Sequence, residues 1–81
     1  MAWQIQAREV VVAWAQQSEN VDAMFAILLW LERLAANGPD PSDDAIGEHG
    51  RVHLESAVLI SYNVIPGEIS AVRISSVIEA S

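Results

Sequence analysis

The stretch from Val21 to Pro39 reads VDAMFAILLWLERLAANGP and carries the strongest structural signal in the chain. Its apolar residues recur at helical spacing, and further apolar residues widen the stripe beyond an ordinary amphipathic face. Either Ser18 or Asn20 is a suitable N-cap. Asn37-Gly38 is suited to the left-handed C-terminal position, and Pro39 prevents continuation. We therefore predict a helix from about Val21 to Asn37.

This helix is apolar around nearly its whole circumference between Ala23 and Leu31. One sheet covers only one side of a helix, so a second surface is expected to cover the other side. A symmetric homodimer or the amphipathic helix of a partner protein would do so. The residues that we expect at such an interface are Val10, Trp14, Phe25 and Trp30.

The segment before this helix has two interpretations. Trp3, Ile5 and Ala7 alternate with polar residues, which favours a strand over Trp3–Ala7 followed by a helix to about Gln17. Trp3 and Ala7 also share a helical stripe with Val10 and Trp14. We take the strand as the prediction.

After the helix, residues 38–50 are rich in glycine, proline and aspartate, which predicts a loop, with one short helical turn between Ser42 and Gly47. From Arg51 the apolar period changes to two, which predicts strands over 51–55, 58–64 and 69–77, the last two joined around Pro66-Gly67. The whole chain, residues 1–81, is thus expected to form one α+β domain. Its two N-terminal helical segments would pack on a small, mainly antiparallel sheet, in the order β-α-α-β-β-β.

Composition limits the partners. Four arginines and no lysine face eleven carboxylates, for a net charge of −7, which argues against nucleic acid and anionic membranes. The longest apolar run, nine residues, is about half a membrane span. The N-terminus lacks the basic and apolar regions of a signal peptide. We expect a soluble cytoplasmic protein, with no cysteine chemistry and no cofactor.

The loop contains a group of potential metal ligands, Asp40, Asp43, Asp44, Glu48 and His49. Their spacing does not follow the calcium-loop pattern of alternating carboxylates around a central glycine. A solvated acidic loop without a metal site is the prediction.

Candidate catalytic residues lie in the strands. Either His49 or His53 is a possible general base, and Arg51 could stabilise a developing phosphate charge. Glu55 and Tyr62 would complete an acid–base cluster. Strand alternation places Arg51, His53 and Glu55 on one face, which is also the pattern of the solvent face of a half-buried strand. The interpretation that this is a solvent face is preferred.

Three stretches resemble the RelE/ParE superfamily of small toxins from toxin–antitoxin modules. Met1 to Ile5, continuing to Val10 and Trp14, looks like the first strand and helix of that family. Ile27 to Pro39 is similar to its second helix and Gly-Pro exit, and Val58 to Val64 with Ile69 to Ile74 looks like its central hairpin. The resemblance implies the α+β fold and, for active members, cleavage of messenger RNA or inhibition of a target such as gyrase.

The sequence departs from that family where its chemistry lies. Ribosome-dependent members commonly carry an arginine inside the central strand and basic residues after the last strand. Here the matching positions are Leu59 and Ser75-Ser76. Among the candidates, Arg51, Tyr62 and Arg73 could stand for the family's functional side chains. We therefore expect a non-catalytic interaction protein, such as a degenerate or antitoxin-binding relative, with an active toxin and an obligate structural homodimer as alternatives.

Overall fold

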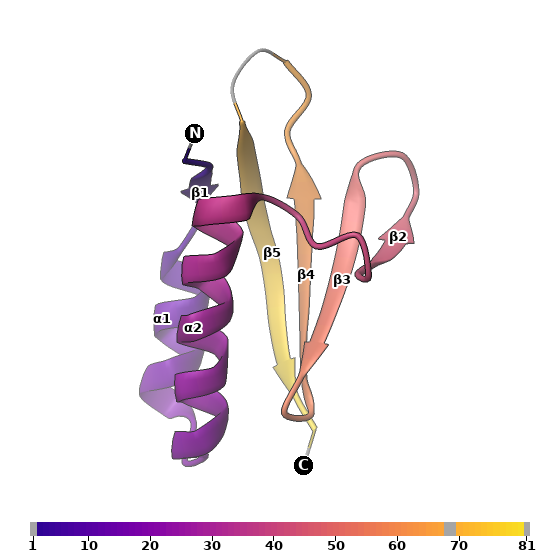
Figure 1. Ribbon diagram of the computed structural model, residues 1–81. Coiled ribbons are helices and arrows are strands. Elements are labelled where there is room, and N and C mark those ends of the chain that lie inside the picture. Colours follow the sequence, from indigo (N-terminus) through magenta and orange to yellow (C-terminus); the bar gives the residue numbers. More distant parts are fainter. Residues whose placement is uncertain (1, 68–69, 81) are drawn as a thin grey trace.

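The computed structural model describes residues 2–67 and 70–80 of the chain. The described part is an α+β fold with two helices and a five-stranded sheet. The elements in chain order are β1 (Gln4–Gln6), α1 (Glu9–Gln17), α2 (Val21–Asn37), β2 (Asp44–Ile46), β3 (Gly50–Glu55), β4 (Val58–Val64) and β5 (Ala71–Glu79). Figure 1 shows both helices on one side of the sheet.

The sheet is mainly antiparallel, as predicted. Its strand order is β1-β5-β4-β3-β2, and only the β1–β5 pair is parallel. The two-residue turn Ser56-Ala57 joins β3 to β4, and the Glu55↔Val58 pair closes it. Both turn residues have positive φ, 52° and 63°, which is the backbone of a type I′ turn.

The core lies between α2 and the two central strands. Ala23, Ile27 and Leu34 on one face of α2 are buried with Ile60 and Ile74 of the sheet. Val11, Val58, Tyr62 and Val72 are also fully buried. Asn20 begins α2, since its side-chain oxygen accepts a hydrogen bond from the Ala23 N–H. Gly38 ends α2 at φ 79°.

The predicted helices and the first strand are confirmed, but the loop prediction is wrong in one respect. The expected helical turn between Ser42 and Gly47 is absent. In its place β2 pairs antiparallel with β3, Ile46 opposite Gly50, and Gly47 takes φ 66° in the connection. The strand expected over 69–77 is observed from Ala71 to Glu79, and Ile69 lies outside the described residues.

The orientation of β3 also differs from the prediction. Arg51, His53 and Glu55 do share one face, but they lie opposite Tyr62, Ile60 and Val58, which are buried core residues. Directly paired residues share a face of the sheet, so these polar side chains lie on the helix side. Leu54 pairs with Leu59, which pairs with Ile78, and these three apolar residues occupy the open face.

Candidate functional site

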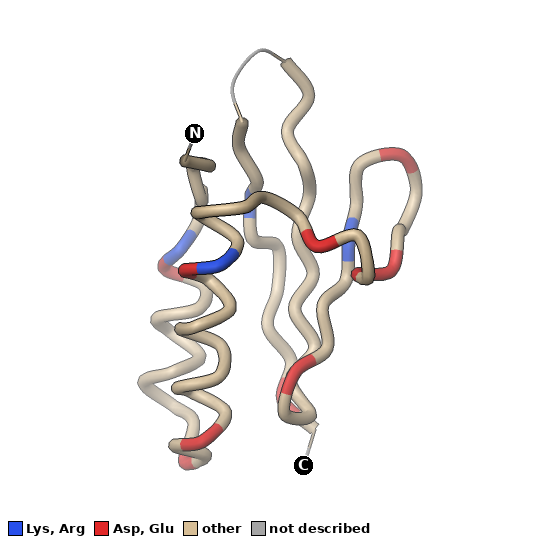
Figure 2. Tube along the Cα trace, in the orientation of Figure 1, with Lys and Arg blue, Asp and Glu red and all other residues tan. Residues whose placement is uncertain are grey.

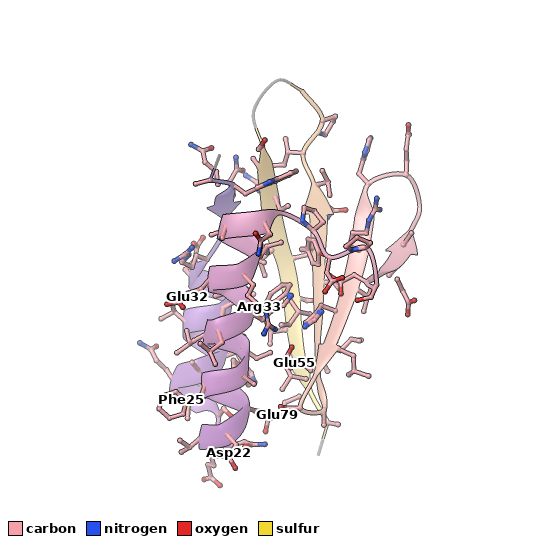
Figure 3. All side chains as sticks on the ribbon, in the orientation of Figure 1. Asp22, Phe25, Glu32, Arg33, Glu55 and Glu79 are labelled. Carbon is pink, nitrogen blue, oxygen red and sulfur yellow. The ribbon has the colours of Figure 1, made fainter. Side chains whose placement is uncertain are left out.

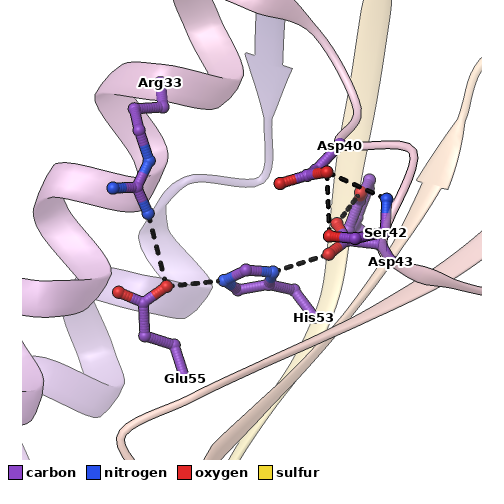
Figure 4. Close-up of polar contacts among 7 residues, drawn as sticks. Arg33, Asp40, Ser42, Asp43, His53 and Glu55 are labelled. Carbon is purple, nitrogen blue, oxygen red and sulfur yellow. Dashed lines mark hydrogen bonds and ion pairs between the residues drawn. The ribbon is translucent and has the colours of Figure 1, made fainter.

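A chain of polar side chains runs from the 40–43 turn to the surface of α2, centred on His53 (Figure 4). His53 Nδ1 lies 2.6 Å from Asp43 Oδ1, and His53 Nε2 lies 2.8 Å from Glu55 Oε1. The same Glu55 oxygen is 3.3 Å from Arg33 Nη2. We call Asp43, His53, Glu55 and Arg33, together with Tyr62, the His53 cluster.

The local backbone positions Asp43. The Asp43 N–H donates to the Asp40 carbonyl, and the Asp40 carboxylate accepts from both the N–H and the hydroxyl of Ser42. This is an aspartate-initiated turn with Pro41 at its second position. The hydrogen bond from the Ser42 N–H, followed by that from its hydroxyl, holds the pKa of Asp40 below its usual value.

Asp43 turns inward from this position. Its side chain is only 3% exposed, and its second carboxylate oxygen accepts a 2.5 Å hydrogen bond from the Tyr62 hydroxyl. Burial of the phenol, followed by its hydrogen bond to Asp43, raises the pKa of Tyr62 far above its ordinary value. The prediction of a uniformly solvated acidic loop is therefore wrong for Asp43.

The aromatic contact fixes the His53 ring. Trp30 of α2 stacks on the imidazole at a centroid distance of 4.6 Å, and it meets Tyr62 edge to face at 5.6 Å. His53 thus has carboxylates at both nitrogens and an indole on one face. Its side chain is 11% exposed.

The donors and acceptors around the two His53 nitrogens limit the chemistry that the cluster can perform. Each nitrogen of His53 faces a carboxylate oxygen, and a carboxylate has no proton to donate. A neutral imidazole has one N–H, so both contacts form together only when the cluster holds a further proton. In the arrangement with imidazolium, two carboxylates and one guanidinium, the charges cancel. A general base needs a free nitrogen within reach of a substrate proton, and neither nitrogen is free.

The positions of the Asp43 and Glu55 carboxylates do not favour binding of one metal ion by both groups. The two imidazole nitrogens point away from each other, so Asp43 and Glu55 bind opposite sides of the ring and do not converge on one point. Within residues 2–67 and 70–80, no three acidic or histidine side chains are grouped to hold a metal ion. His49 lies outside the cluster, 3.9 Å from Glu48.

The four candidate catalytic residues do not converge. His53 and Tyr62 meet through Asp43, as described above. Arg51 Nη1 donates to the carbonyl of Gly50 at 2.8 Å. Arg73 pairs with Asn63, on the face opposite the His53 cluster, and lines a shallow depression with Gln6, His49 and Asn63.

The expected interface residues are also separated. Trp30 is 3% exposed, so it is a core residue of this chain. Val10 and Trp14 pack against the same core, and the Trp14 indole N–H donates to Glu79 at 3.0 Å. Phe25 alone among the four is well exposed, and Figure 3 shows it on the outer side of α2.

Sequence reasoning included His53, Glu55 and Tyr62 in one cluster but omitted Asp43, Trp30 and Arg33 from it. Asp43 lies ten positions before His53, and Arg33 lies twenty-two before Glu55. No local pattern links residues that far apart. The available signal was the Asp-Pro-Ser-Asp sequence, which predicts a turn but not the direction of its last side chain.

No family model, curated protein or solved structure matches the chain. Within the described residues, no helix is long and apolar enough to cross a membrane.

Proposed function

We propose that this chain is a non-catalytic protein on a RelE/ParE-like scaffold that works in the cytoplasm by binding another protein chain. The engagement of both His53 nitrogens by carboxylates is the observation that carries the proposal. The imidazole of His53 is thereby fully engaged in hydrogen bonds within the chain. The cluster then serves to hold the 40–43 turn and α2 against β3.

The distribution of charge supports the proposal. The four arginines are spread over the fold, with Arg8 just before α1, Arg33 on α2, Arg51 on β3 and Arg73 on β5 (Figure 2). Gripping a nucleic acid backbone requires several cations in one groove. Leu59 lies on the open face near the start of β4, at the position where an RNA-cutting relative would be expected to carry an arginine.

Exposed apolar surface supports a binding role. Val21, Phe25, Leu28 and Leu29 form an exposed stripe on α2, and Leu54 and Ile78 are exposed on the sheet. Contiguous apolar surface of a few hundred Å² marks interaction sites more often than ordinary surface.

Induced expression in bacteria tests the non-catalytic assignment. We expect growth and total messenger RNA to match those of an uninduced culture. Purified protein added to ribosomes translating a defined message should leave that message intact. Growth arrest with message cleavage, lost on Arg51→Ala or Arg73→Ala, would contradict the proposal.

One observation favours RNA cleavage as a second candidate function. Arg73, His49, Asn63 and Gln6 line one depression on the open face, which brings a cation and an imidazole to the same surface. The His49 side chain is exposed there and is free of the His53 cluster. If this candidate is correct, His49→Ala and Arg73→Ala each abolish cleavage, whereas His53→Asn acts only through stability.

A further inference from the structure

The outer surface of α2 carries four exposed large apolar side chains. Its stripe follows the spacing i, i+4, i+7 and i+8, at Val21, Phe25, Leu28 and Leu29. Val12 of α1 is exposed as well. The inner face of the same helix is already filled by the core, so nothing within residues 2–67 and 70–80 covers this stripe.

Along one flank of the stripe, a negative charge lies near the N-terminal end of α2 and a positive charge lies near its C-terminal end. Asp22 lies in the first turn of α2, and Arg33 lies near its end. They are eleven positions apart, about three helical turns, so both project on the same side of the stripe. The side chain of Arg33 is 59% exposed, and among the described residues its one ion pair is the 3.3 Å contact with Glu55. Figure 3 shows Asp22 and Arg33 toward opposite ends of the helix, with Phe25 between them.

This arrangement is self-complementary. In an antiparallel pair of identical helices related by a two-fold axis, the N-terminal end of each helix lies beside the C-terminal end of the other, on the same flank. The midpoint of Phe25 and Leu29 is Ile27, and the midpoint of Asp22 and Arg33 falls between Ile27 and Leu28. One axis position therefore places the apolar residues together and each Asp22 beside the partner copy's arginine at position 33.

The remaining acidic residue of this surface also fits the pairing. Glu32 follows the stripe at its C-terminal end, so an antiparallel copy brings its carboxylate toward the N-terminus of the other α2, where the helix dipole favours negative charge. The net charge of −7 opposes self-association, but screening limits this repulsion to about 8 Å at physiological salt. The opposite charges and apolar side chains at the α2 surface therefore determine whether two copies associate.

We propose that the chain forms a symmetric homodimer through α2, with Phe25, Leu28 and Leu29 at the two-fold axis and reciprocal Asp22–Arg33 ion pairs at its flank. This inference rests on the proposed binding function and names the partner as a second copy of the chain. The exposed stripe, on the order of 400 Å² on each copy, would form the apolar centre of an interface that buries about 800 Å² per partner.

Sedimentation or light scattering over a dilution series tests the dimer directly. The unmodified chain should have twice the 8.8 kDa mass of one copy at micromolar concentration. Phe25→Glu, which enters the symmetric contact twice, should raise the dissociation constant by at least roughly 100-fold. The matched control is Leu54→Glu, since Leu54 is 67% exposed and Phe25 is 65% exposed. Leu54→Glu should leave the dimer intact.

Charge reversal tests the symmetry. Asp22→Arg and Arg33→Asp should each weaken self-association roughly threefold to tenfold, because each creates two like-charge pairs. An equimolar mixture of the two variants should recover the original affinity, since every pair in the mixed dimer is again opposite in sign. The double variant should recover it too. Because mixing changes neither sequence, affinity that was lost through misfolding of a variant would not be recovered.

Three outcomes would overturn the inference. They are a monomeric mass up to about 100 μM in a folded sample, dissociation by Leu54→Glu in place of Phe25→Glu, and failure of the mixture to recover affinity. None of these outcomes touches the non-catalytic assignment, which falls only if the chain cleaves messenger RNA.

Discussion

The imidazole of His53 lies flat against the indole of Trp30, with ring centroids 4.6 Å apart and planes inclined by 11°. This contact joins the third strand to the second helix across a distance that no sequence period connects. It also leaves the edges of the imidazole for Asp43 and Glu55, so the ring is held on one face and at both nitrogens. His53 therefore connects β3 to α2 and to the 40–43 turn.

Asp43 should be the most sensitive member of this junction. Asp43→Ala removes the acceptor of a buried phenol and one partner of His53, so the free energy of unfolding should fall by about 2–4 kcal/mol. Urea denaturation measures the change. The neighbouring Asp44→Asn is a matched control, because Asp44 is exposed and its substitution should cost less than about 0.5 kcal/mol. Equal effects of the two substitutions would mean that the His53 cluster contributes nothing to stability.

Two features of Gly38 disfavour any other residue: its positive φ and its close approach to Trp3. Gly47 has only the first feature, so a comparison of the two glycines separates the two effects. The φ of Gly38 is +79°, and a Cβ there would lie 2.5 Å from the Trp3 indole. Gly47 has φ +66° with no atom within 4 Å of such a Cβ. Gly47→Ala should therefore cost only the left-handed backbone penalty, about 1–2 kcal/mol. Gly38→Ala should cost at least that, because its ψ of −171° puts the backbone in a region that is essentially restricted to glycine, and a further 1–3 kcal/mol or so for displacing Trp3. Thermal or urea unfolding that ranks the two equally would show that Trp3 moves aside without cost.

The Ser56-Ala57 turn is a site where stability can be gained. Both residues hold positive φ without being glycine or asparagine, the residues that type I′ turns favour. Ala57→Gly should raise the free energy of unfolding by about 0.5–1 kcal/mol, because relief of the left-handed penalty exceeds the entropy cost of glycine. Ala45→Gly in β2 should have the opposite sign, since glycine weakens a regular strand. A loss of stability in Ala57→Gly would contradict the assigned turn.

The sequence predicts the α+β class and the bounds of α2 because seventeen residues of strong helical periodicity end in Asn-Gly-Pro. It does not predict β2, since three residues carry no measurable period and their pairing with β3 is set by the backbone at Gly47 and Gly50. Alternation correctly groups Arg51, His53 and Glu55 on one face. Alternation does not say which face of the sheet the helices cover. We predicted the solvent face for these three residues because they are polar, and that prediction is wrong. In the structure His53 and Glu55 of β3 lie on the helix side, where they are partly buried and pair with Asp43 and Arg33.

Tyr62 should control stability in alkaline solution. It is the single tyrosine of a chain without lysine or cysteine, so it is the side chain expected to titrate near pH 10. Its folded pKa is raised by burial and by the bond to Asp43. A raised pKa means that the contribution of Tyr62 to stability is complete below the unfolded value of about 10. Above that pH the unfolded chain loses the proton first, and stability should fall by about 1.4 kcal/mol for each pH unit.

Two measurements check this prediction on one sample. The phenolate absorbance of the folded chain should stay flat through pH 10 and rise only as the chain unfolds, whereas the chain in denaturant should titrate near pH 10. Urea midpoints should decline above pH 10 in the unmodified chain and stay level in Tyr62→Phe, which has no phenol. Tyr62→Phe starts from a lower stability, since the Asp43 oxygen loses its donor, so the comparison is of slopes. A phenolate that forms near pH 10 while the circular dichroism is unchanged would mean that Tyr62 is solvated, and the buried Tyr62–Asp43 hydrogen bond would then be wrong.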